Sequence, residues 1–208
     1  MRLLAALLLA ASLASAAGPA RIRFVKDFPK SEPAYVAIWV DRSGKGEWTD
    51  SPDGARPLAV QLEPAETEAI FGLAEKLDYF ARPLEAGAKV AFTGAKTFRY
   101  EGEPANHEVK FNYTTDPDGR ALTMWFEKIS ETMQRMAGLE SAAKFDKLGV
   151  DREILLLQAA LEGKRLAGAR QLLPLLDRVA ANQTIMNRAR ERASSMAEAI
   201  RAAMSRQD

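Results

Sequence analysis

Residues 88–114 read AKVAFTGAKTFRYEGEPANHEVKFNYT, and this stretch decides the fold class. Apolar and polar side chains alternate along three segments within it, 88–93, 96–101 and 107–114. Successive side chains of a strand point to opposite faces, so the apolar members of each segment share one face. The pattern predicts three antiparallel strands in a meander with one dry face and one solvated face. The apolar members are Val90 and Phe92, then Phe98 and Tyr100, then Val109, Phe111 and Tyr113.

Further strands and one helix are expected upstream of this stretch. Residues 21–25, 34–41 and 58–62 are short apolar segments that favour strands. In residues 34–41 both faces are apolar, so this strand is expected to be covered on both sides. Residues 64–80 begin with a proline suited to a first helical turn and then carry apolar side chains at helical spacing. We expect this helix to pack on the dry face of the meander.

The remainder of the chain has a helical character. An apolar stripe at helical spacing runs through residues 120–137 and predicts a helix that ends at Gly138. Asp151 is expected to cap a further helix, and Asn182 is expected to cap a last long one. The predicted fold class is therefore α+β: an antiparallel β-meander with one packed helix, followed by an all-helical C-terminal part arranged as a small bundle or hairpins.

Three regions follow from these patterns. Residues 1–17 are typical of a cleavable signal peptide, because a basic start precedes an apolar run shorter than the roughly 20 residues of a membrane span and small residues follow it. Residues 18–118 are expected to form a β-rich α+β domain, and residues 119–208 a helical domain or extension. Whether these two parts share one core stays open. The signal predicts export to a periplasm or the extracellular medium.

Composition excludes several classes of function. The 29 Lys and Arg residues nearly balance the 28 Asp and Glu residues, which argues against nucleic acid as a partner because such proteins present a basic face. The chain has no cysteine, so thiol catalysis and thiolate metal sites are excluded. His107 is the single histidine and no G-x-S-x-G elbow accompanies it, so no catalytic triad, metal site or cofactor is predicted. No segment after residue 17 is apolar for long enough to span a membrane.

The candidate binding residues are three arginines of the predicted last helix. Arg188 and Arg192 lie four residues apart and therefore share one helix face, whereas Arg190 lies off that face. Guanidinium groups in this arrangement suit a small anion or an acidic partner. The alternative is a solvated helix face, in which the helix dipole favours positive charge towards the C-terminus.

The sequence favours an exported, non-enzymatic binding or interaction module whose partner is an envelope or extracellular protein. One alternative is a periplasmic or secreted hydrolase that uses carboxylates or a serine–lysine pair, such as Ser43 with Lys45 or Ser141 with Lys144. A second alternative is a carrier of small apolar ligands. Association of the chain with a second copy of itself is also left open.

Overall fold

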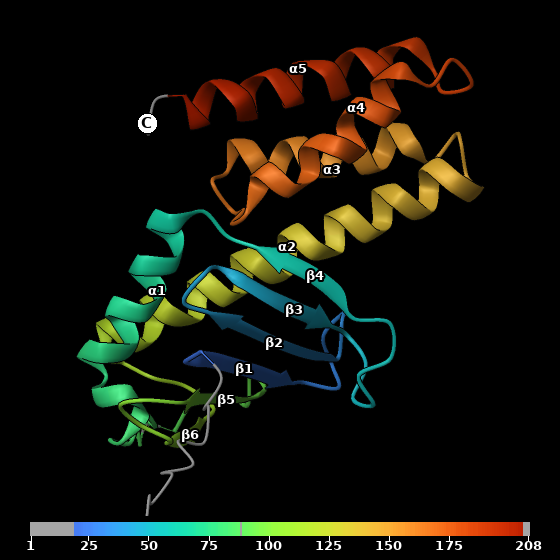
Figure 1. The fold of residues 1–208 in the computed structure, drawn as a ribbon. Coiled ribbons are helices and arrows are strands. Elements are labelled where there is room, and N and C mark those ends of the chain that lie inside the picture. Colours follow the sequence, from blue (N-terminus) through green and yellow to red (C-terminus); the bar gives the residue numbers. More distant parts are fainter. Residues whose placement is uncertain (1–18, 88, 206–208) are drawn as a thin grey trace, which may run out of the picture.

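The computed structural model describes residues 19–87 and 89–205. The signal peptide predicted for residues 1–17 lies outside the described residues. Within the described ranges an antiparallel sheet is followed by helices (Figure 1), which confirms the α+β fold class with a helical C-terminal part. The strands are β1 (Arg21–Asp27), β2 (Tyr35–Asp41), β3 (Lys45–Thr49), β4 (Leu58–Gln61), β5 (Ala95–Glu101) and β6 (Glu108–Phe111). The helices are α1 (Pro64–Lys76), α2 (Pro117–Phe145), α3 (Val150–Glu162), α4 (Leu173–Ala181) and α5 (Asn187–Met204), with short 3-10 turns at Asp78–Phe80 and Ala169–Leu172.

The strand order in the sheet is β4-β3-β2-β1-β5-β6, with every neighbouring pair antiparallel. Helices α1 and α2 lie on one face of this sheet. The first half of α2 completes the cover that was expected from residues 64–80 alone. Phe126 of α2 stacks on Phe24 of β1 with ring centroids 5.1 Å apart, and it also lies against Phe98 of β5 at 5.7 Å.

The prediction of a strand at residues 88–93 is wrong. Residues 89–93 form no strand, and the place beside β5 is taken by β1. The Asn112 side chain bonds the backbone of this segment instead, since its Oδ1 accepts from the N–H of Thr93 at 2.7 Å and its Nδ2 donates to the carbonyl of Ala91 at 3.2 Å. The alternating apolar residues therefore remain outside the core, and Phe92 is 59% exposed.

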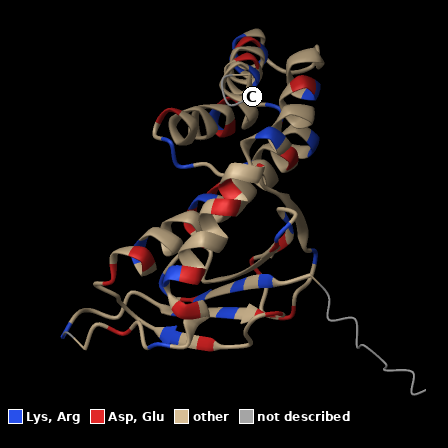
Figure 2. Cartoon of the chain, turned by 60° about the vertical axis from the view of Figure 1, so that its left-hand side comes forward, with Lys and Arg blue, Asp and Glu red and all other residues tan. Residues whose placement is uncertain are grey.

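The expectation that residues 34–41 are covered on both sides is also wrong. Val36, Ile38 and Val40 of β2 are buried against the helices. Tyr35 and Trp39 on the opposite face are only half-buried. The helices α1 and α2 lie above the sheet in Figure 2, and no described helix lies below it. The apolar character of this second face is thus a property of the molecular surface.

Helix α2 does not end at Gly138 as expected, but continues to Phe145. A Cβ at Gly138 would lie 2.8 Å from Oε2 of Glu153 on α3, so the glycine leaves room for this carboxylate against α2. Its role is packing, and the backbone stays helical. The first half of α2 contributes Leu122, Phe126, Ile129 and Met133 to the core between the sheet and the helices. The second half contributes Leu139 and Ala142 to a separate core shared with α3, α4 and α5.

The last helix begins later than expected. Asn182 does not cap it, because its Oδ1 accepts from the N–H of Thr184 at 3.0 Å within a turn. Helix α5 starts at Asn187 and packs its alanine-rich stripe against α4. Small side chains at Ala189, Ala193 and Ala197 are fully buried, so the two helices lie close together.

Candidate binding hollow between α2 and the β1–β2 hairpin

The arginines predicted to bind an anion have intramolecular partners in the structure. Arg188 donates from Nη2 to Oδ2 of Asp151 at 2.6 Å, and Arg192 donates from Nη1 to Oδ1 of the same carboxylate at 2.7 Å. Arg190 points elsewhere and donates from Nε to the carbonyl of Ala180 at 3.0 Å. The hydrogen bond from Arg188 is the main reason why the pKa of Asp151 lies below its usual value. These contacts tie α5 to the first turn of α3, and anion binding by the three arginines stays a prediction.

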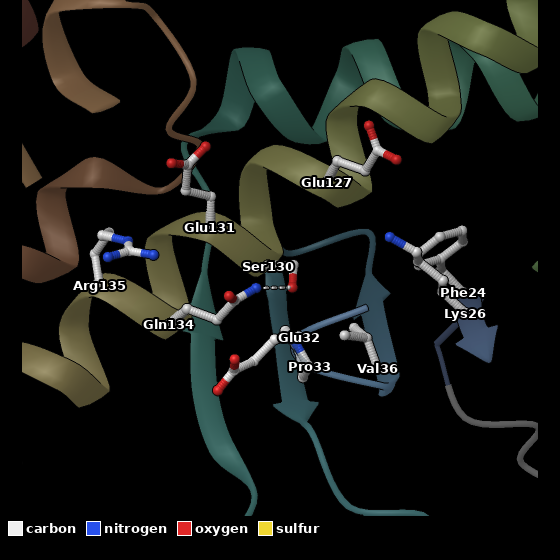
Figure 3. A pocket seen from close by; sticks show the side chains of 10 residues that line it. All are labelled: Phe24, Lys26, Glu32, Pro33, Val36, Glu127, Ser130, Glu131, Gln134 and Arg135. Carbon is white, nitrogen blue, oxygen red and sulfur yellow. Dashed lines mark hydrogen bonds between the residues drawn. The ribbon is translucent and has the colours of Figure 1, made fainter. Parts of the chain in front are cut away.

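A hollow of about 230 Å³ lies between α2 and the hairpin that joins β1 to β2 (Figure 3). We call it the α2 hollow. Its apolar lining comes from Phe24, Pro33 and Val36, of which Phe24 and Val36 belong to the core between the sheet and the helices. Polar and charged side chains complete the lining, namely Lys26, Glu32, Glu127, Ser130, Glu131, Gln134 and Arg135. The hollow therefore combines an apolar base with a charged rim.

Two elements position these side chains. The residues from α2 stand at positions 127, 130, 131, 134 and 135, and this spacing places them on one face of a helix. Glu32 lies in the hairpin loop, where the hydroxyl of Ser31 is 2.9 Å from the carbonyl oxygen of Phe28 and 2.8 Å from that of Pro33. The backbone N–H of Phe28 also donates to the carbonyl of Ala34 at 2.7 Å. These bonds hold the hairpin side of the hollow in place.

Several polar groups of the rim are already paired. Ser130 accepts hydrogen bonds from Nε1 of Trp48 at 3.1 Å and from Nε2 of Gln134 at 2.9 Å. Arg165 donates to Glu131 at 2.5 Å, and Nη1 of Arg135 lies 3.9 Å from a carboxylate oxygen of Glu153. These side chains fix the walls of the hollow.

Three charged groups of the rim remain unpaired. Among the described residues, none forms a hydrogen bond or an ion pair with the side chain of Lys26, Glu32 or Glu127. The hollow thus offers two carboxylates and one ammonium group to whatever occupies it. Lys26 adds positive charge next to the buried Lys96, whose pKa is lowered first by burial and then by Lys26.

Ser130 of the hollow accepts hydrogen bonds from Trp48 and Gln134, and no described side chain accepts the proton of its hydroxyl as an activating base would. Ser43 belongs to a turn in which its hydroxyl donates to Asp41 at 2.7 Å, and Ser141 and Lys144 are exposed on α2. Within residues 19–87 and 89–205, no three His, Cys, Asp or Glu side chains form a group that could hold a metal ion.

The sequence contained a partial signal for the α2 hollow. Glu127, Glu131 and Arg135 follow at intervals of four residues within the helix expected at 120–137, so their common face could be inferred. The contribution of Lys26 and Glu32 could not, because their hairpin lies about a hundred positions earlier in the chain and only the tertiary packing brings it to α2.

No protein-family model matches the sequence, and no curated protein matches it. None of the described helices has both the length and the apolar run that a membrane span requires.

Proposed function

We propose that this chain is an exported, non-enzymatic module that binds another protein of the cell envelope or the extracellular medium. In this proposal the α2 hollow receives a long basic side chain, lysine or arginine, of that partner. The observation that carries the proposal is the pair of unpaired carboxylates, Glu32 and Glu127, at the rim of an apolar base. Export rests on the signal-like residues 1–17.

The size of the hollow supports a single side chain as its occupant. Sites for small molecules measure about 300–1,000 Å³, and the α2 hollow measures about 230 Å³. A pocket that takes one side chain near the centre of an interface is a common form of binding hot spot. The hollow is thus better suited to a partner protein than to a carried ligand or a metabolite.

The lining matches the two ends of a basic side chain. Lysine and arginine bury their aliphatic stems along apolar surface while the charged head stays polar. Phe24, Pro33 and Val36 provide surface for the stem, and a carboxylate at either end of the hollow, Glu32 or Glu127, is an acceptor for the head (Figure 3).

The proposal is tested in the native host with a photo-crosslinking amino acid at Gln134 of the full-length chain. We expect one discrete adduct with an exported protein, and we expect Glu127→Lys to abolish it because the rim then repels the incoming cation. Glu68→Lys is the matched control, since Glu68 is exposed on α1 and outside the lining of the hollow. Adduct formation that persists in Glu127→Lys, or that is lost equally in Glu68→Lys, contradicts the proposal.

A further inference from the structure

We infer that the open face of the sheet carries a second binding site, independent of the α2 hollow, for an acidic peptide segment. The site centres on Arg23 of β1 and Trp39 of β2. It lies on the face opposite to the helices, so its occupant does not compete with a side chain bound in the α2 hollow.

The strand register places a row of charged and aromatic side chains across this face. Arg23 stands opposite Trp39 on one side and opposite Arg99 on the other. Trp39 in turn stands opposite Glu47, and Arg99 stands opposite Glu108. Directly opposed side chains of neighbouring strands are close enough to interact. The row therefore forms one continuous strip over five strands.

Most charges of this strip are satisfied within the protein. Arg99 lies 3.1 Å from a carboxylate oxygen of Glu101 and 4.0 Å from one of Glu108, and Arg21 also pairs with Glu101. Trp39 donates from Nε1 to Glu47 at 3.0 Å. Arg23 has no ion pair or hydrogen bond with another described side chain. An exposed guanidinium without a partner is thus left in the middle of the strip.

A hollow of about 230 Å³ opens beside this guanidinium. Arg21, Arg23 and Trp39 line it from the sheet, and Gly54 and Pro57 line it from the loop that joins β3 to β4. Arg21 holds a second positive charge there, since its guanidinium lies 5.7 Å from the centroid of the Trp39 ring.

The loop that walls this hollow is braced from within. Oδ1 of Asp53 accepts from the hydroxyl of Ser51 at 2.5 Å and from the N–H of Ala55 at 2.9 Å. These bonds, led by that from Ser51, hold the pKa of Asp53 below its usual value. The hydroxyl of Thr49 also lies 3.3 Å from the carbonyl oxygen of Ala55. The wall is therefore formed before any partner binds, which lowers the entropy cost of binding.

This arrangement fits a glutamate or aspartate side chain in an extended segment. Arg23 can donate two parallel hydrogen bonds to a carboxylate, a geometry that a guanidinium provides and an ammonium does not. The methylene groups of the acidic residue then contact Trp39 and Pro57. Arg21 is paired with Glu101 and Glu47 bonds Trp39, so the unpaired guanidinium of Arg23 is the charge that attracts such a segment.

Calorimetric titration of the full-length protein with a hexaglutamate peptide tests the inference. We expect saturable binding that Arg23→Gln weakens about tenfold or more, as for the loss of hydrogen bonds to a charged group. Arg99→Gln is the matched control: it removes the same charge from the same strip, but from an arginine with internal partners, and a change under about twofold is expected.

Three results overturn the inference. They are the absence of hexaglutamate binding, an equal loss in Arg23→Gln and Arg99→Gln, and binding of an acidic oligosaccharide such as oligogalacturonate in place of the peptide. Glu68→Lys, which lies outside both hollows, is titrated in parallel and is expected to bind hexaglutamate as the unmodified protein does. If no partner protein binds the α2 hollow, the binding of hexaglutamate at Arg23 is still expected.

Discussion

Asp151 joins two helices through a carboxylate that both Arg188 and Arg192 hold. We expect Asp151→Asn to lower the thermal unfolding midpoint, because an amide oxygen cannot replace both charged acceptors. The pKa of Asp151 is lowered in the folded protein, so its stabilising contribution is present above the unfolded-state pKa of about 3.9 and is lost as the pH falls through the folded-state pKa. The difference in unfolding midpoint between Asp151→Asn and the unmodified protein should therefore become smaller as the pH falls.

Asp177→Asn provides the comparison, since Asp177 pairs with Arg201 and both side chains are about half exposed, at 51% and 49%. Exposed ion pairs contribute little to stability, so we expect a smaller change in the unfolding midpoint. Equal effects of the two substitutions, or a gap for Asp151→Asn that does not depend on pH, would show that the arginine pair does not stabilise the carboxylate.

The carboxyl group of Glu66 has a raised pKa, in contrast to that of Asp151. Burial raises its pKa, although its carboxylate accepts hydrogen bonds from the N–H groups of Glu63 and Gly168. A raised folded-state pKa gives stability that is present below the unfolded-state pKa of about 4.3 and is lost as the pH rises through the folded-state pKa. We therefore expect Glu66→Gln to be at least as stable as the unmodified protein at pH 7 and to lose this advantage near pH 4.

Urea unfolding at a series of pH values measures this difference. Glu68→Gln is the control on the same helix, because Glu68 is exposed and its side chain has no recorded partner among the described residues. A loss of stability in Glu66→Gln at pH 7 that matches its loss at pH 4 would show that the hydrogen bonds outweigh the cost of burying the charge.

At the scale of elements, Gly138 leaves room on α2 for the carboxylate of Glu153 from α3. We expect Gly138→Leu to lower the free energy of unfolding by about 1–3 kcal/mol, because the Glu153 side chain, which is buried there, must leave its place to make room. Gly72→Leu on α1 is the matched control. Nothing lies within 4 Å of a Cβ at Gly72, so the better helix propensity of leucine should raise stability by up to about 1 kcal/mol. Denaturant titration gives the free energy of unfolding of both variants. A higher stability of Gly138→Leu than of the unmodified protein would contradict the proposed contact.

The same glycine shows where the sequence pattern stops being informative. Gly138 after an apolar stripe predicts a helix end, because glycine commonly follows the last helical turn. A glycine inside a helix, where a neighbouring side chain needs the space, looks the same in the sequence. Only the position of Glu153 on α3 shows that Gly138 is a glycine of this second kind. Likewise, the alternation in residues 89–93 favours a strand, but whether a strand forms depends on a free neighbour. β1 occupies that place beside β5.

The elements with long, regular patterns were predictable because their sequence pattern agrees with their packing. The stripe in 120–137 and the alternation in 96–101 each bury a complete apolar face, so local periodicity and tertiary packing agree. The candidate sites depend on contacts between distant segments. Glu127 on its own predicts a solvated helix face, and its role at the α2 hollow appears only when the hairpin with Glu32 lies beside it.

The described residues form two apolar clusters that α2 joins. The first lies between the sheet and the helices α1 and α2, the second lies among α3, α4 and α5, and Met136 contacts both. A polar contact also fixes the loop between α3 and α4 on α2, because the hydroxyl of Thr132 donates to the carbonyl of Ala167 at 2.8 Å and accepts from the N–H of the same residue at 3.1 Å. Ala167 belongs to the first cluster, whereas Leu166 and Ala169 beside it pack against the second. Since Thr132 is fully buried, this contact is protected from water. It couples the helical part to the sheet part.

Thr132→Val tests this coupling. Both backbone groups of Ala167 then lose their partner in a buried position, at a cost of about 1–3 kcal/mol. Trp39, Trp48 and Trp125 all belong to or pack near the sheet cluster, so their fluorescence reports its unfolding, whereas far-UV circular dichroism reports mainly the helices. We expect the two signals to share one unfolding midpoint in the unmodified protein and to separate in Thr132→Val, with the helical signal lost first. Thr123→Val removes only a bond to Gly119 within α2 and should leave the midpoints together. Midpoints that also coincide in Thr132→Val would mean that α2 alone is enough to make the two clusters unfold as one.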